Sequence, residues 1–178
     1  MDIALRQVTE ADAVRLQQLS HRTFSETFAE SNSPEDMRAY LQDRLSLQKL
    51  TLELQSTESK FVFAESASTP VGYAKLNWGN AQTEARGAAS VELERLYVVQ
   101  EFKGRGVGSL LMDWSFREAR SLGAHELWLG VWEHNRDARA FYARYGFEQV
   151  GSHVFRLGGD DQTDLILAKS LIEYDPQN

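Results

Sequence analysis

Apolar residues in the first third of the chain recur at helical spacing after one short alternating segment. Residues 2–8 alternate weakly between apolar and polar side chains and predict an edge strand. Residues 33–36, Ser-Pro-Glu-Asp, are typical of a helix start, with a serine cap, a proline and two acids in the first turn. The predicted helical stripes are Ala13, Leu16, Leu19, Thr23 and Phe24, then Met37, Tyr40 and Leu41, then Leu47, Leu50 and Leu54.

The middle of the chain changes to runs of β-branched and aromatic residues. Residues 60–65 and 71–78 flank the segment Ser68-Thr69-Pro70 and predict a hairpin. A polar segment at 80–90 predicts a loop, and residues 91–99, VELERLYVV, predict the next strand.

The last third of the chain alternates between helices and strands. Residues 125–132 predict an apolar strand, and Asn135 is placed to cap a helix that Gly146 would end. Residues 147–157 and 163–171 predict a closing hairpin. Its turn is Gly158-Gly159-Asp160-Asp161, and the two helical stripes of this third are Val107, Leu110, Leu111 and Trp114, and Ala138, Phe141, Tyr142 and Tyr145.

The resulting element order, βαααβββαβαββ, predicts an α/β (α+β) sandwich with a mixed sheet of about seven strands. The chain has 178 residues, and it contains no repeat and no linker rich in Pro, Gly and Ser. We therefore expect a single domain over residues 1–178.

Composition narrows the classes of partner. The net charge of −7 argues against nucleic acid, which attracts clustered Lys and Arg. No apolar run is as long as a membrane span, and the N-terminus lacks the pattern of a secretion signal. The chain has no cysteine, which excludes disulfides and thiolate metal sites and favours a cytoplasmic location.

The segment EFKGRGVGSLL, residues 101–111, places three glycines between a predicted strand and a predicted helix. Backbone amides at a helix start suit a phosphate, and glycine lets such a group approach closely. A turn that merely needs open dihedrals is an equally good explanation of the glycines alone. The dinucleotide pattern G-x-G-x-x-G does not match the spacing Gly104-x-Gly106-x-Gly108, and the phosphate-loop pattern G-x-x-x-x-G-K-[ST] is absent.

Two motifs together resemble those of the GCN5-related N-acetyltransferases (GNAT). LYVVQEFKGRGVGSLLM resembles the family signature [QR]-x-x-G-x-[GA], with Lys103 in place of the usual Arg or Gln. NRDARAFYARYGF resembles the downstream A-x-x-F-Y-x-x-x-G-F, with Ala138 one residue early. Nearly the whole chain is most similar to the PaiA-type spermidine/spermine N-acetyltransferases.

The resemblance implies a GNAT fold with acetyl-CoA in the cleft between the fourth and fifth strands. The loop would hold the pyrophosphate, and the Val98 amide would polarise the thioester carbonyl, a donor typically worth ~3 kcal/mol. The expected acetyl-CoA-binding residues are Leu96, Tyr97, Val98, Lys103, Gly104, Arg105, Gly106, Val107, Gly108, Ser109, Asn135 and Tyr142.

Acetyl transfer to an alkyl amine needs a base, because an amine of pKa ~10.4 is almost fully protonated at pH 7. Strand alternation places Glu92, Glu94, Leu96 and Val98 on one face. The two carboxylates are candidate general bases, with Glu94 slightly favoured, and the alternative is a pair of solvated charges near a strand end. By resemblance both positions host such a base.

Tyr142 lies on the apolar face of its predicted helix, where periodicity alone indicates a core tyrosine. The family pattern instead implies that Tyr142 protonates the departing CoA thiolate. Asn135 matches a position that bonds the pantetheine arm, and it can also be a simple helix cap. His21, His125, His134 and His153 show no ligand spacing with nearby acids, so we expect no metal, and Trp132 is a candidate for the acceptor cleft.

The resulting hypothesis is an acetyl-CoA-dependent N-acetyltransferase of the acyltransferase class, acting on a polyamine by direct transfer. Acetylation of another small amine or a protein N-terminus, and a non-catalytic acetyl-CoA-binding regulatory module, are the alternatives. The expected partners are a small-molecule amine and, in a homodimer, a second copy of the chain, with neither nucleic acid nor membrane. Further carboxylates that could bind a polyamine are Glu26, Glu30, Glu35 and Asp36.

Overall fold

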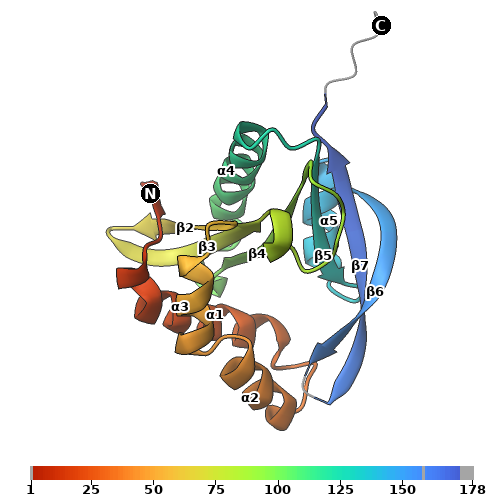
Figure 1. The fold of residues 1–178 in the computed structure, drawn as a ribbon. Helices are drawn as coiled ribbons and strands as arrows, with labels where there is room; N and C mark the ends of the chain where they lie inside the picture. The colour runs from red at the N-terminus through yellow and green to blue at the C-terminus, as the bar shows by residue number, and fades with distance from the viewer. Residues whose placement is uncertain (1, 158, 173–178) are drawn as a thin grey trace, which may run out of the picture.

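A computed structural model describes residues 2–157 and 159–172. In this part of the chain seven strands form one mixed sheet, in the order β1-β2-β3-β4-β5-β7-β6 (Figure 1). The strands are β1 (Ile3–Gln7), β2 (Ser59–Ser66), β3 (Thr69–Asn77), β4 (Ser90–Val98), β5 (Glu126–Trp132), β6 (Glu148–Leu157) and β7 (Asp160–Ser170).

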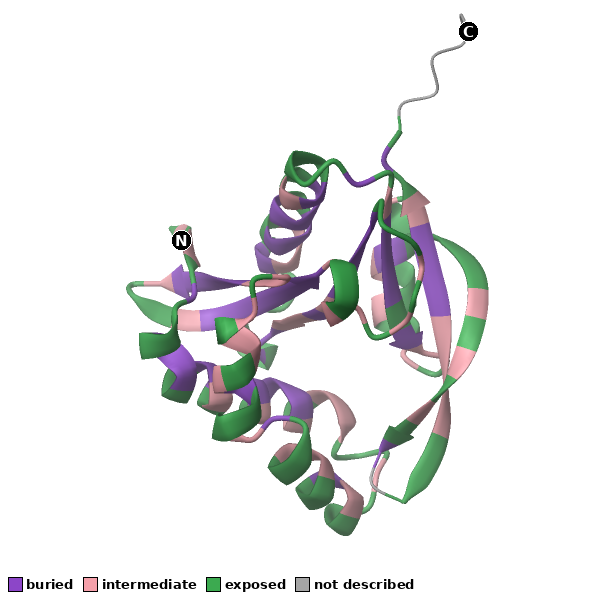
Figure 2. Cartoon of the chain, in the orientation of Figure 1, coloured by how far each residue is buried: buried purple, intermediate pink, exposed green. Residues whose placement is uncertain are grey.

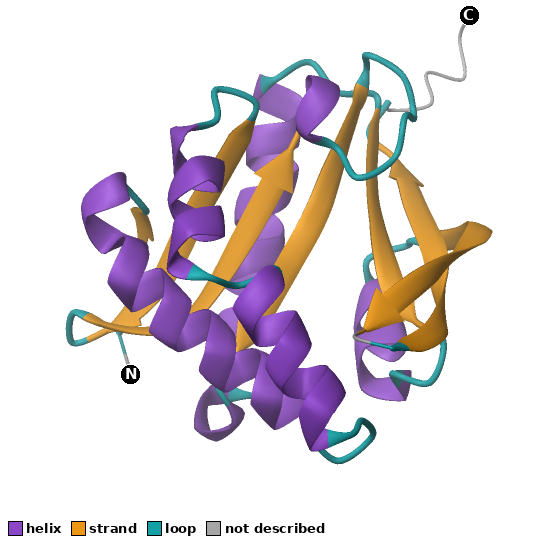
Figure 3. Ribbon diagram, turned by 60° about the horizontal axis from the view of Figure 1, so that its bottom comes forward, coloured by secondary structure: helices purple, strands orange, loops and turns teal. Residues whose placement is uncertain are grey.

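Helices cover both faces of the sheet, as Figure 3 shows. Helices α1 and α3 contact β2, β3 and β4 on one face, while α4 packs on the same strands from the other. The α-helices are α1 (Ala13–Phe28), α2 (Pro34–Asp43), α3 (Leu47–Gln55), α4 (Val107–Ser121) and α5 (Arg136–Arg144), and short 3-10 helices span Glu10–Asp12, Gly79–Ala81 and Gln100–Phe102. This order of strands and α-helices is the predicted βαααβββαβαββ.

Local capping forms as the sequence predicts. The Ser33 side chain accepts a hydrogen bond from the Asp36 amide at 3.1 Å, and Asn135 accepts one from the Ala138 amide at 3.1 Å. Gly146 follows α5 with φ 76°, a left-handed conformation that glycine adopts without strain. The proposed turn of the last hairpin includes Gly158, which lies outside the described residues.

Two details differ from the sequence prediction. The turn between β2 and β3 is Ala67-Ser68, both with positive φ, so Thr69 and Pro70 belong to β3 instead. Of the predicted apolar face of α4, Val107, Leu111 and Trp114 are buried, but Leu110 is 38% exposed and Met112 is buried in addition.

The hydrophobic core lies between the sheet and the helices that cover its two faces. Buried side chains are concentrated on β2 to β5 and on the inner face of α4, whereas the edge strand β6 is largely exposed (Figure 2). None of the helices within residues 2–157 and 159–172 combines the length and apolar surface that crossing a membrane requires.

Candidate active site

The sheet opens between its two central parallel strands. In the described residues β4 and β5 pair at three positions, ending with Glu92 opposite Trp128. Beyond that pair the strands diverge, and β5 continues to pair with β7 on its other side. Beyond Glu92 the backbone edge of β4 is left unpaired by β5, and Leu96 and Tyr97 line a cleft there, where free amides and carbonyls can bind an extended ligand.

A β-bulge at Glu94 changes which side chains face the cleft. Lys75 of β3 pairs with Arg95, and the next pair is Leu76 with Leu93, so Glu94 has no partner in this register. The extra residue reverses the alternation after it. Tyr97 stacks on Tyr73 beneath α1, whereas Leu96 and Val98 pair with Ala74 and Gly72 on the α4 side. The prediction that Leu96 and Val98 share a face with Glu92 is therefore wrong.

Glu92 and Glu94 nevertheless meet on the face that α1 and α3 cover. The Asn77 amide donates to both carboxylates, at 3.2 Å to Glu92 and 2.5 Å to Glu94. Strand alternation alone places Glu92 and Glu94 on one face, as predicted, and the bulge adds Arg95 to the same face.

Glu94 is an ionised and fully engaged carboxylate. Its oxygens lie 2.5 Å from Lys75 Nζ and 2.8 Å from the Arg95 guanidinium. Burial alone would raise the pKa of Glu94, but these two cations and the hydrogen bonds from Lys75 and Asn77 lower it to about 2. Such a carboxylate has little affinity for a proton near neutral pH.

Glu92 has the opposite electrostatics. It is buried and accepts hydrogen bonds from the Thr83 amide at 2.8 Å, the Thr83 hydroxyl at 2.5 Å and Asn77. Burial, with the nearby Glu94 charge, raises the pKa of Glu92 above its ordinary value. Its proton affinity suits a base better, but its oxygens are already occupied by donors.

The glycine loop leads directly into α4. Gly106 is the N-cap of α4 with φ 83°, and Gly104 has φ 73°. A Cβ at either position would meet no atom within 4 Å, so both glycines border open space beside uncapped helix amides. Gly108 lies in the first turn of α4, where a Cβ would be in ordinary van der Waals contact, 3.5 Å from the Phe141 ring.

The other loop residues differ in exposure. Lys103 and Arg105 are exposed, and the Arg105 guanidinium lies 5.6 Å from the centre of the Phe102 ring. Val107 is buried in the core, and Ser109 is half-buried in the first turn of α4. The two cations can therefore attract an anionic group to the helix start.

A cavity of about 150 Å³ lies at the inner end of the cleft. It is lined by five of the predicted site residues, Glu94, Leu96, Tyr97, Asn135 and Tyr142. Burial raises the pKa of Tyr142 above its ordinary value, which keeps its hydroxyl protonated. Aromatic rings and a second carboxylate complete the wall: Phe24, Phe28, Tyr40, Tyr73, Trp132, Phe155 and Asp164.

A broader groove of about 780 Å³ opens beside this cavity. Its charged lining contains five carboxylates and five Arg or Lys side chains. The predicted polyamine carboxylates lie outside that lining, apart from Glu92 and Glu94. Two of the carboxylates outside the lining already have partners elsewhere. Glu26 forms an ion pair with Arg22, and Asp36 accepts a hydrogen bond from the Gly159 amide at 2.6 Å.

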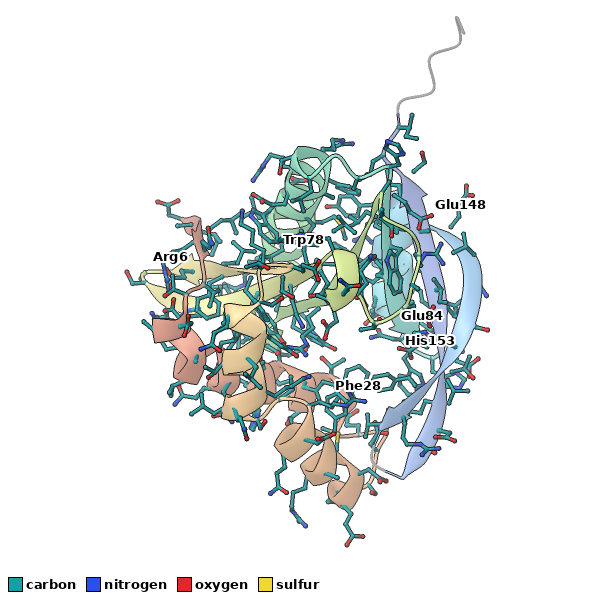
Figure 4. All side chains as sticks on the ribbon, viewed as in Figure 1. Arg6, Phe28, Trp78, Glu84, Glu148 and His153 are labelled. Atoms are coloured by element: carbon teal, nitrogen blue, oxygen red, sulfur yellow. The ribbon has the colours of Figure 1, made fainter. Side chains whose placement is uncertain are left out.

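Sequence reasoning missed three groups on the far side of the groove. His153 of β6 lies opposite Asp164 of β7, and its Nδ1 contacts Glu84 from the loop before β4 (Figure 4). These residues are 69 and 11 positions apart and follow no motif spacing. The pairing of β6 with β7, and of β7 with β5, places His153 and Asp164 at the cleft, where the loop before β4 brings Glu84 to His153.

The open parallel strand pair, the uncapped helix start and the buried tyrosine define an acyltransferase of the GNAT type. A family model described as the acetyltransferase (GNAT) family matches residues 14–147, and the chain belongs to this family. The predicted fold class and N-acetyltransferase activity are thereby confirmed.

Relatives and solved structures agree with this assignment. The chain is 38% identical over 170 residues to an uncharacterized N-acetyltransferase in the pepI 3' region of Lactobacillus delbrueckii subsp. lactis, covering 96% of this chain and 98% of that protein. It is 25% identical over 152 residues to spermidine N(1)-acetyltransferase of Thermoplasma acidophilum, covering 83% and 89%. The crystal structure of PaiA N-acetyltransferase from Thermoplasma acidophilum in complex with coenzyme A superposes with a TM-score of 0.80 at 23% identity, covering 96% and 99%.

Proposed function

We propose that this N-acetyltransferase uses acetyl-CoA to acetylate a primary amine of a polyamine, by direct attack of the amine on the thioester. The observations that carry the acetyl-CoA part are the open glycine cradle at Gly104 and Gly106 and the edge of β4 that β5 leaves unpaired beyond Glu92. The spermidine-acetylating relative supports the polyamine part.

The residues present fit acetyl-CoA at both ends. Amides at the start of α4, with Lys103 and Arg105, would hold the pyrophosphate, and the pantetheine arm would extend along Leu96 to Val98. Asn135 lines the cavity as well as capping α5, so its side chain can serve both roles. The Val98 amide would polarise the carbonyl that the amine attacks.

Tyr142 is proposed as the acid that protonates the departing thiolate. Tyr142 lines the cavity, and the raised pKa of its hydroxyl keeps the proton available at neutral pH. For the base, Glu92 is the better candidate of the predicted pair, because Glu94 is held as an anion by Lys75 and Arg95. Glu92 lines the groove but not the small cavity, so to serve as the base it would need an intervening water.

One observation favours a second class of acceptor. Arg44, Lys49 and Arg156 line the same groove as the carboxylates. These cations would suit an acceptor that carries a phosphonate or carboxylate beside its amine.

A thiol-release assay with purified enzyme and acetyl-CoA tests both possibilities. The panel is spermidine, spermine, an aminoalkylphosphonate, an alkyl monoamine and a peptide N-terminus. We expect the highest kcat/KM for the polyamines. A higher kcat/KM for the aminoalkylphosphonate than for the polyamines would favour an acceptor that carries an anionic group beside its amine. Acetyl-CoA binding without acetylation of any amine would contradict the proposal as a whole.

A further inference from the structure

Removing a proton from the acceptor amine needs a carboxylate with two properties. It must border the cavity that contains Tyr142, and it must have an oxygen free to accept the proton. Glu94 borders the cavity but is paired with two cations, and Glu92 does not border it. Neither predicted base has both properties.

Asp164 has both. It lines the small cavity and the broader groove, so it stands at the wall where the two join. Its side chain is 14% exposed, and its Oδ1 is buried without a hydrogen-bond partner among the described residues. Burial raises the pKa of Asp164 to about 6, against a lowering effect of His153. A buried oxygen without a donor is a costly feature that commonly marks a functional site.

A chain of titratable groups leads from Asp164 to the surface. His153 Nε2 lies 3.9 Å from Asp164 Oδ2. His153 Nδ1 contacts Glu84, whose side chain is 33% exposed (Figure 4). Gly130 of β5 lies beside both groups, since a Cβ there would be in ordinary van der Waals contact with the Asp164 carboxylate and the His153 ring.

The remaining ionisable groups around the cavity do not compete for this role. Glu94 and Arg95 of β4 neutralise each other, and the Tyr40 and Tyr142 hydroxyls are kept protonated by burial. His153 is therefore the one titratable neighbour through which Asp164 can pass a proton within the described residues.

We propose that Asp164 is the general base of the acetyl transfer, and that His153 and Glu84 relay the proton from it to solvent. This inference rests on the proposed function, since it concerns the amine that the site acetylates.

The steps balance in protons. The acceptor R–NH3⁺ gives one proton to the Asp164 carboxylate, and the neutral amine forms a C–N bond to the thioester carbonyl carbon. The C–S bond then breaks, Tyr142 gives its proton to the leaving thiolate, and the second proton of the attacking nitrogen returns to Tyr142. Asp164 passes its proton to His153 and on through Glu84, so each turnover releases one proton to solvent.

The test compares pH profiles of kcat/KM for the wild type, Asp164→Asn, Glu92→Gln and Glu94→Gln with the best amine of the panel. For the wild type we expect kcat/KM to fall as the pH drops below about 6, where Asp164 becomes protonated. Asp164→Asn should lower kcat/KM by about 10²-fold at pH 7, and the loss should shrink toward the amine pKa of ~10. A merely structural role would give a loss that does not depend on pH.

Two further variants sharpen the result. His153→Gln should slow turnover less than Asp164→Asn and leave acetyl-CoA affinity unchanged, while Asp160→Asn, an exposed position on the same strand, should match the wild type. A wild-type profile in Asp164→Asn, or the pH-dependent loss appearing in Glu92→Gln instead, would overturn the proposal while acetyl transfer still stands. A wild-type enzyme that acetylates no amine would contradict the proposed function itself.

Discussion

Lys75 and Glu94 form a buried ion pair, with Nζ 2.5 Å from the carboxylate oxygen. Lys75 side chain exposure is 5%, and Glu53 of α3 lies 3.0 Å from the same ammonium. The two carboxylates and the cations Lys75 and Arg95 thus form a compact charged cluster that ties α3 to the bulge of β4. Their geometry supports a structural role for Glu94 in holding the bulge that opens the cleft.

Glu94→Gln should therefore act mainly on stability. The variant leaves Lys75 and Arg95 with Glu53 as their common partner, so we expect a loss of about 1–3 kcal/mol, below the full cost of breaking a buried pair. Urea denaturation at pH 7 measures it. Glu118→Gln, which removes the half-buried partner of Lys60, is the control and should cost less than ~1 kcal/mol. Equal losses in the two variants would contradict the structural role.

The free energy of unfolding should decline in acid over a defined pH range. The pKa of Glu94 and the pKa of Asp12 are both lowered to about 2 by their cationic partners. A carboxyl whose folded pKa is depressed stabilises the fold above its unfolded pKa, and that contribution disappears as the pH falls through the folded pKa. The free energy of unfolding should thus fall from about pH 5 to pH 2, and Asp12→Asn should flatten part of this slope. A free energy independent of pH across that window would refute the assignment.

Gly106→Val should abolish acetyl-CoA binding. Valine at φ 83° is strained, and its side chain would occupy the open space beside the α4 amides. Gly123→Val is a matched control, because Gly123 has φ 73°, borders open space and lies beyond the other end of α4. Calorimetry should show lost binding in the first variant and near-normal binding in the second, with similar destabilisation of both. Near-normal affinity in a folded Gly106→Val variant would show that the glycine loop does not bind the pyrophosphate of acetyl-CoA.

Tyr142→Phe should lower kcat by about 10²-fold while acetyl-CoA affinity changes little, because only the hydroxyl is lost. Tyr145→Phe, at the C-cap of the same helix, is the control, since the Tyr145 ring packs against Phe116 and Phe141 and does not line the cavity. Steady-state kinetics with both variants measure the difference. If Tyr142→Phe and Tyr145→Phe turn over alike, Tyr142 is a core tyrosine only.

A polyamine acceptor should show salt-dependent selectivity. Its second ammonium would interact with groove carboxylates such as Glu84, and salt screens that attraction. Spermidine should exceed an alkyl monoamine in kcat/KM, chiefly through KM, and the ratio should shrink between 50 and 500 mM salt (about a threefold change in screening length). The same kcat/KM for both amines at every salt concentration would exclude polyamine selectivity.

Local patterns were sufficient for the order of the elements and for the glycine loop. Ser33 and Asn135 cap their helices because a short polar side chain at that position satisfies an amide that the helix leaves free. Gly104 and Gly106 adopt positive φ for an equally local reason, since the chain must turn from β4 into α4 within a few residues.

Tertiary structure decided the chemistry of the carboxylates. Alternation could not reveal the bulge at Glu94, because a bulge depends on the register with β3, and that bulge delivers Glu94 to Lys75 and Arg95. Asp164 carries no sequence signal, yet the insertion of β7 beside β5 places it in the cavity wall. Local sequence patterns determined the elements, their caps and the glycine loop. The proton affinity of a carboxylate depends on burial and on neighbouring charges, which exist only once distant strands have paired.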